Sequence, residues 1–117
     1  MKEIMAFIRT QKVEDTRKAL ELNGFYAYTC RKCLGHGKER LSSAGKSLVQ
    51  AMDSSENRRL IAKRYFTVIV DDEDVKREVK IIIEANRTGN PGDGKIFVRS
   101  LDESYCVRTG EINNLTT

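Results

Sequence analysis

The sequence predicts an α/β fold of the α+β type, in which two strand–helix–strand units are joined by a long loop between strands 2 and 3. Three observations predict it. Apolar residues alternate along residues 2–9, the spacing changes to helical over residues 13–23, and the same change recurs after residue 70. Each half also runs from an apolar strand through an acidic helix start to a glycine turn. This order is that of the ferredoxin-like βαββαβ arrangement, an antiparallel sheet with both helices on one face.

The first strand has two apolar faces. Ile4, Ala6 and Ile8 lie on one face, and Met5 and Phe7 lie on the other. Both helices of the expected fold cover the same face of the sheet. Because a monomer would leave the second apolar face in water, we expect the chain to form an oligomer.

The first helix is expected over residues 13–23, where Glu14 and Asp15 in the first turn suit the helix dipole and Gly24 suits a C-cap. Its apolar stripe consists of Val13, Thr16, Ala19 and Leu20. Residues 25–34 are rich in aromatic and β-branched side chains and predict the second strand.

A long segment, residues 35–62, separates the two halves and shows no sustained period. Connections beyond ~12–15 residues are usually functional or disordered. Basic residues gather at its end, namely Arg58, Arg59, Lys63 and Arg64. We therefore predict a flexible arm that docks on an acidic protein surface. The alternative is an insertion without a role.

In the second half, residues 65–70 predict strand 3, and the acidic run 71–74 offers an N-cap and first turn for the second helix. The residues that this helix should bury are Val75, Val79, Ile82 and Ile83. After a glycine-rich loop, residues 95–101 predict the last strong strand, and residues 105–107 a shorter extended piece.

The glycine-rich loop is the stretch around which the chain is organised. Residues 89–95 match the first seven positions of a phosphate-binding P-loop, but Ile96 follows where a P-loop has Ser or Thr, and the segment runs from helix to strand instead of strand to helix. A P-loop is therefore excluded. Three glycines still allow backbone N–H groups to converge on an anion beside the charge of Lys95. The alternative is an ordinary tight turn with a surface lysine.

The composition is that of a globular domain, with 117 residues, 32% charged and 39% hydrophobic, and we expect one domain over residues 1–117. A chain of this size has little room for a deep cavity, so a ligand site should be shallow or shared between subunits. The sequence shows no signal peptide and no apolar run of the ~18 residues that a membrane span needs, which predicts a cytoplasmic protein without a membrane span. The net charge of +4 is spread along the chain, which indicates a solvated surface.

The three cysteines argue against a disulfide framework, because their number is odd and no export signal is present. Cys30, Cys33, Gly35 and Gly37 fit a C-x-x-C-x-G-x-G zinc half-site, but the motif occurs once, whereas structural zinc takes four ligands. An offset of three along a strand also turns the two thiols to opposite faces. We expect no structural metal, and a zinc or redox protein is the alternative.

Residues 88–98, TGNPGDGKIFV, resemble the C-terminal signature of the PII signal-transduction proteins at every specified position. The similarity extends over nearly the whole chain. Residues 1–4 resemble a PII first strand, residues 35–38 stand where the long T-loop of that family begins, and Lys63 stands where it ends. Residues 107–111, VRTGE, resemble the closing motif. The sequence is thus identified as a member of this family.

The resemblance implies a trimer that binds ATP or ADP in clefts between subunits and acts as a regulatory protein, not as an enzyme. The T-loop would span residues 35–62, and the C-terminal segment residues 105–117. The residues implied to bind the nucleotide are Thr29, Gly35, Gly37, Lys38, Thr88, Gly89, Gly92, Asp93, Gly94, Lys95 and Arg108.

Charge agrees with this set, because Lys38, Lys95 and Arg108 supply the cations that a triphosphate needs. The resemblance also implies Mg²⁺ as cofactor and 2-oxoglutarate as effector, with Lys63 and Glu39 as the residues that bind them.

Four features depart from the family pattern. Glu39 replaces the usual glutamine, so a carboxylate faces a dicarboxylate unless the metal bridges them. Cys106 stands where an arginine often contacts phosphate, and Thr67 replaces a frequent glutamate near the nucleotide. Residues 35–62 contain no tyrosine, so the tyrosine modification seen in some members has no acceptor.

The first strand, the Lys63–Arg64 pair and the tyrosine-free loop look most like the nitrogenase-associated branch, second type. This implies a homotrimer, or a hetero-oligomer with a related PII-like subunit, and nitrogenase as the target. A PII protein that controls an ammonium transporter or glutamine synthetase is the alternative. An RNA-binding ferredoxin-like module is a remote one, because Phe66 and Phe97 do not stand in an RNP-type Gly-Phe pattern, and we expect no nucleic acid.

Overall fold

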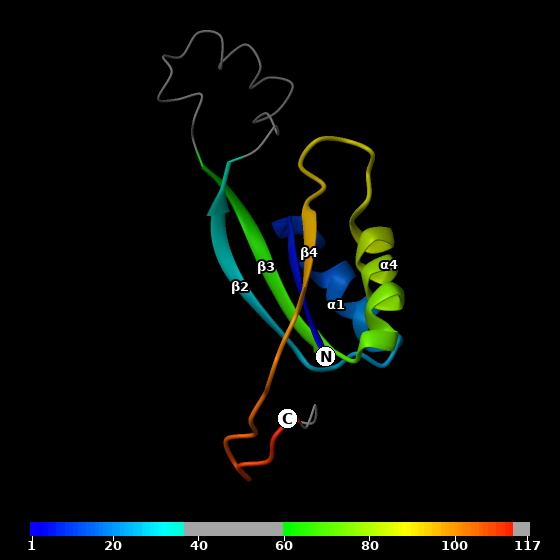
Figure 1. The fold of residues 1–117 in the computed structure, drawn as a ribbon. Coiled ribbons are helices and arrows are strands. Elements are labelled where there is room, and N and C mark those ends of the chain that lie inside the picture. The colour runs from blue at the N-terminus through cyan, green and yellow to red at the C-terminus, as the bar shows by residue number, and fades with distance from the viewer. Residues whose placement is uncertain (37–59, 114–117) are drawn as a thin grey trace, which may run out of the picture.

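The computed structural model of the chain describes residues 1–36 and 60–113. In chain order the elements are β1 (Lys2–Arg9), α1 (Val13–Leu22), β2 (Tyr28–Gly35), β3 (Ile61–Val70), α4 (Val75–Asn86) and β4 (Lys95–Ser100), with 3₁₀ turns at Thr10–Lys12 and Asp72–Asp74 before the two helices. Within the described residues the strands form one four-stranded antiparallel sheet, and both helices cover the same face of it (Figure 1). The predicted ferredoxin-like α+β fold is confirmed.

The order of the strands is β2-β3-β1-β4. β1 is central and pairs with both β3 and β4, so that Phe7 is opposite Tyr65 on one side and opposite Lys95 on the other. At the end of β1, Arg9 is opposite Lys63. This register brings the end of β1, the start of β3 and the start of β4 together at one end of the sheet. Residues that are far apart in the sequence therefore share this end.

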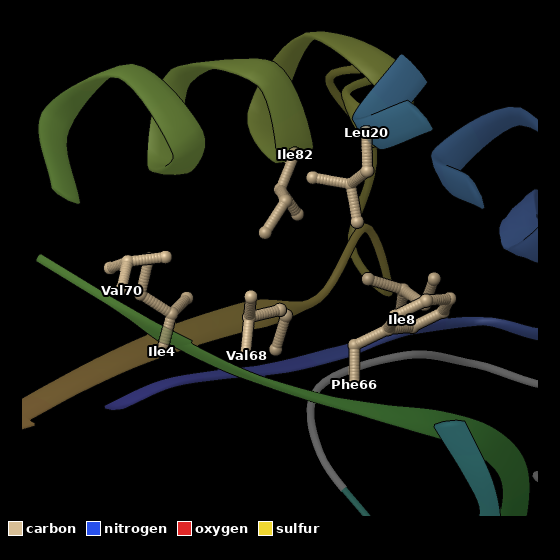
Figure 2. Packing of buried hydrophobic residues seen from close by; sticks show 8 residues of the cluster. Ile4, Ile8, Leu20, Phe66, Val68, Val70 and Ile82 are labelled. Atoms are coloured by element: carbon tan, nitrogen blue, oxygen red, sulfur yellow. The ribbon is translucent and has the colours of Figure 1, made fainter. Parts of the chain in front are cut away.

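The core lies between the sheet and the helix layer. Leu20 of α1 and Ile82 of α4 point from the helices toward β1 and β3 (Figure 2). The strand residues of the core are Ile4, Ala6, Ile8, Phe66, Val68 and Val70, all buried. The predicted core face of the first strand is confirmed. Fully burying an aliphatic side chain of this size stabilises the fold by about 1.5–3 kcal/mol.

The two described helices are joined by a buried polar contact. Asn86 Nδ2 donates to Thr16 Oγ1 (2.9 Å) and to Ile82 O (2.9 Å), and Thr16 Oγ1 donates to Lys12 O (2.7 Å). The contact links the first turn of α1 to the last turn of α4, immediately before the glycine-rich loop. No helix in the described part of the chain is long and apolar enough to cross a membrane.

Two strands begin at other residues than predicted. β2 begins at Tyr28, three residues after the predicted start, because the chain from Asn23 to Ala27 connects α1 to the sheet and the Arg77 guanidinium stacks 4.4 Å from the centre of the Phe25 ring. β3 begins at Ile61, four residues before the predicted start. The charged side chains of Lys63 and Arg64 hid this extension, in which residues 61–64 pair with residues 32–35 of β2.

Two local predictions at the helix and strand ends are confirmed only in part. Residues 105–107 form no strand. Tyr105 makes a single bridge with Ile112, and a turn follows it. Asp74 of the predicted acidic run is the N-cap residue of α4, but its side chain makes no capping bond. A 3₁₀ turn precedes α4, and in it Asp74 N donates to Asp71 O (3.0 Å). The predicted C-cap at Gly24 is confirmed by its left-handed φ of 86°.

Candidate functional site

The glycine loop, residues 87–94, connects α4 to β4 and lies at the same end of the sheet as the end of β2 and the start of β3 (Figure 1). Asp93 organises it from within. Its carboxylate accepts hydrogen bonds from the backbone N–H groups of Thr88 (2.8 Å) and Gly89 (2.8 Å) and from the Thr88 hydroxyl. These bonds hold the pKa of the Asp93 carboxyl well below its usual value, with the Thr88 hydroxyl as the largest cause.

Arg9 fixes this loop to the central strand. Its guanidinium donates to Asp93 Oδ1 (2.6 Å) and to Pro91 O (2.8 Å), and the ion pair is largely shielded from solvent. The sequence predictions missed Arg9. Its only signal was a charge at the end of an otherwise apolar strand, which by itself says nothing about a partner 84 residues away.

Lys63 fixes the loop from a second side. At the start of β3, its Nζ donates to Gly92 O (2.9 Å). The residue that the resemblance assigns to 2-oxoglutarate therefore already lies beside the loop assigned to phosphate.

Gly94 shows how closely the loop packs on β1. Its φ is 122°, and a Cβ at this position would lie 2.1 Å from Phe7 O. No side chain fits there, so the last turn of the loop rests directly on the backbone of the central strand. Gly92, with a φ of 99°, also needs the left-handed region.

A hollow of about 660 Å³ lies between this loop and the ends of β2 and β3. Six predicted site residues line it, namely Gly35, Lys63, Gly92, Asp93, Gly94 and Lys95. The remaining lining residues were not predicted, and they are Phe7, Cys33, Leu34, His36, Ile61, Asn90 and Pro91. The Lys63 and Lys95 charges with the loop backbone suit an anion, and the apolar wall suits a flat ring. The sequence could not place the apolar wall, because its members come from three elements and from the loop.

The other predicted residues do not line this hollow. Thr88 and Gly89 bind the Asp93 carboxylate instead. Thr29 lies further along β2, opposite Thr67. Arg108 belongs to the segment after β4, which leaves the sheet at the end away from the loop (Figure 1). Gly37, Lys38 and Glu39 lie outside the described residues.

Arg108 is held in a compact turn. Gly110 N donates to Cys106 O (2.7 Å), and Cys106 N donates to Glu111 O (2.8 Å). The Thr109 hydroxyl, together with backbone N–H groups of the turn, lowers the pKa of the Cys106 thiol. Arg108 and Val107 are exposed at this turn. Nothing in the described chain covers them, and one chain alone does not bring Arg108 to Lys95.

The described residues hold no group of three or more His, Cys, Asp or Glu side chains that could bind a metal ion. Cys30 and Cys33 are both free thiols. Cys33 borders the hollow, whereas Cys30 packs against the core, so the two thiols lie on opposite faces of β2.

Comparison with known proteins agrees with this arrangement. The family model "Nitrogen regulatory protein P-II" matches residues 1–111. "Nitrogen fixation nifHD region GlnB-like protein 2" of Methanothermococcus thermolithotrophicus is 38% identical over 124 residues, covering 98% of this chain and 97% of the relative. "Nitrogen fixation nifHD1 region GlnB-like protein 2" of Methanosarcina barkeri is 40% identical over 120 residues, with 98% of each chain covered. "Nitrogen regulatory protein P-II 2" of Methanothermobacter thermautotrophicus is 36% identical over 112 residues, covering 95% and 92%.

Proposed function

The chain belongs to the nitrogen regulatory protein P-II family, and on this premise we propose that it is a sensor that binds ATP or ADP, with Mg²⁺, in a cleft shared between subunits. The observation that carries the proposal is the hollow beside Gly92–Lys95, where a rigid glycine loop, two lysines and an apolar wall meet. The loop amides and Lys95 would hold the phosphates. Lys63 would hold the carboxylate of 2-oxoglutarate, with Glu39 acting through the metal.

The proposed sharing of the site rests on Arg108. Arg108 follows the end of β4 that is opposite to Lys95, and this supports a site in which the two cations come from different chains. A neighbouring subunit can supply Arg108 and Thr29. The exposed sheet face fits the same assembly. On it, Phe7 packs against Tyr65 (4.9 Å between ring centres) and Phe97 (6.2 Å), and Phe97 is 47% exposed. We propose a trimer, or a hetero-oligomer with a related subunit, that covers this face.

Lys95→Ala and Arg108→Ala should each weaken ATP binding on the order of tenfold to a hundredfold, because a charge-assisted contact contributes ~1.5–3 kcal/mol. Both side chains are exposed, so the fold should persist. Equilibrium binding of labelled ATP measures the effect, and Lys76→Ala on the outer side of α4 is the matched control. Unchanged affinity in Lys95→Ala would refute the phosphate site.

Co-expression of the two variants tests the sharing directly. If Lys95 and Arg108 act from different subunits, randomly mixed trimers regain both cations in about one quarter of their sites. If both act from one chain, no site regains them. Sedimentation of the same samples gives the oligomeric state, and a monomer at micromolar concentration contradicts the proposal.

For the output, we propose that residues 35–62 act on a target, and that the target is nitrogenase. The support is that two of the relatives carry "nitrogen fixation" in their names. Nucleotide and effector would act by favouring one state of this segment over another.

Replacement of residues 42–57 by a short Gly-Ser linker should leave ATP binding intact and abolish inhibition of nitrogenase. A nitrogenase assay with the variant, alone and with a paired subunit, measures the outcome. Retained inhibition would show that this segment is not the output. If the target is instead an ammonium transporter or glutamine synthetase, the unmodified chain itself should leave nitrogenase activity unchanged.

A further inference from the structure

Two cations face each other across β2 and β3. Lys32 is directly opposite Arg64 in the antiparallel register, and Arg64 is in turn opposite Ile8 of β1. Directly paired residues turn their side chains to the same face of a sheet. Because Ile8 belongs to the core, Lys32 and Arg64 lie on the helix side of the sheet.

This cation pair, Lys32 and Arg64, destabilises the fold, because like charges directly opposite each other in a sheet repel. Within residues 1–36 and 60–113, no carboxylate lies within 4.0 Å of either side chain to offset the repulsion. The neighbouring Arg9 and Lys63 are different, because Arg9 is paired with Asp93 and Lys63 donates to Gly92 O. Among the described residues nothing neutralises this pair of adjacent cations, and this favours an anion supplied by a partner.

The surroundings of the pair indicate which kind of anion fits. The two cations border a second hollow, of about 380 Å³, whose other lining residues are Thr10, Cys33, Leu34, Ala62 and Lys63. No acidic residue of the described chain borders it. Leu34 is 66% exposed, so an apolar surface stands next to the charges. Thr10 begins a 3₁₀ turn, and the other described lining residues belong to the strands β2 and β3, not to a glycine-rich turn of the kind that usually binds a single small anion.

We propose that this second hollow is a docking site for an acidic segment of a partner protein, in which carboxylates alternate with apolar side chains. The carboxylates would bind Lys32 and Arg64, and an apolar side chain would contact Leu34. β2 is an edge strand of the described sheet, so an extended segment can approach from its outer side. The inference rests on the proposed function, since it names the chemistry of the target segment. The two hollows share Cys33, Leu34 and Lys63, but Lys32 and Arg64 border only the second one.

The decisive variant is Lys32→Glu. It replaces the repulsion with an attraction to Arg64, so thermal stability should rise, by about 2–5 °C in Tm. It also removes the anion site, so affinity for an acidic segment should fall by at least about tenfold, with the loss shrinking as salt screens the charges. Most variants that lose binding also lose stability. For Lys32→Glu, the Tm must rise while the affinity for the acidic segment falls.

The probe is a dye-labelled peptide of alternating glutamate and leucine, measured by fluorescence anisotropy against the same peptide with glutamine in place of glutamate. Lys76→Glu on α4 changes the net charge equally and should keep the parent affinity. Three outcomes overturn the proposal: equal binding of the glutamine peptide, undiminished binding by Lys32→Glu, or a changed sedimenting mass of Lys32→Glu, which would mean that a second copy of the chain fills the hollow.

ATP binding of Lys32→Glu should equal that of the parent. If the parent chain itself does not bind ATP but the peptide results are as expected, the nucleotide proposal fails and the docking site stands.

Discussion

Gly94→Ala is expected to abolish ATP binding and to lower stability by several kcal/mol. The added methyl would lie 2.1 Å from Phe7 O, and Phe7 is in the central strand, whose backbone cannot move without shifting its pairing with both β3 and β4. Overpacking of this kind costs about 1–3 kcal/mol. Holding alanine at a φ of 122° costs roughly 1–3 kcal/mol more. The loop should therefore leave β1, which breaks the Arg9–Asp93 contact and displaces Lys95.

Gly24→Ala is the matched control for this prediction. Gly24 also has a left-handed φ, 86°, but an added Cβ there meets nothing within 4 Å. Gly24→Ala should lower the free energy of unfolding by only about 1 kcal/mol and leave ATP binding unchanged. Urea unfolding and ATP titration of both variants separate backbone strain from the collision with Phe7. Equal stability and equal ATP affinity of the two variants would mean that the loop does not pack on β1.

Local patterns predicted the elements whose side chains face the core. The alternation of Ile4, Ala6 and Ile8 predicted β1, and helical spacing predicted α4. The buried stripe predicted for α4 was right only in part, because Ile82 is buried, Val75, Val79 and Ile83 are half-buried, and the other buried residues are Glu78 and Asn86. The patterns failed to predict the start of β3, which is set by pairing with neighbouring strands. Residues 61–64 are strand because they pair with β2, and Lys63 and Arg64 pair with β1 as well, not because of their side chains.

The candidate site was predictable in part, and for different reasons. Gly92–Lys95 stand in one short motif, so resemblance alone identified them. Arg9 was missed because its partner is 84 residues away, and only the fold brings them together. The motif also could not show that the Asp93 carboxylate accepts hydrogen bonds from the loop itself. Only the backbone of Asp93 is therefore available to approach a phosphate.

Glu78 gives the last prediction, a pH-dependent one. It lies on the inner side of α4, fully buried, and neither carboxylate oxygen has a hydrogen-bond partner among the described residues. Burial raises the pKa of Glu78 from 4.5 to about 7, and the charge of Asp74 adds to the rise, while Arg77 opposes it. Its two charged neighbours both belong to the start of α4. The buried group therefore stays protonated well above the pH at which it ionises in the unfolded chain.

The sign of the effect follows from this shift. Between pH 4.5 and about 7 the folded chain binds the Glu78 proton and the unfolded chain does not, so stability falls as pH rises through this range. Above about pH 7, the free energy of unfolding of the parent is lower by about 3 kcal/mol than at pH 4.5. Glu78→Gln keeps the shape of the side chain but cannot ionise. Its free energy of unfolding should therefore match that of the parent at pH 4.5 and exceed it by about 3 kcal/mol at pH 8. Urea unfolding at both pH values and at one protein concentration measures the difference.

Glu84→Gln on the exposed side of α4 should change stability by less than about 0.5 kcal/mol at either pH. A Glu78→Gln effect of equal size at both pH values would mean that Glu78 does not hold a proton in the folded chain.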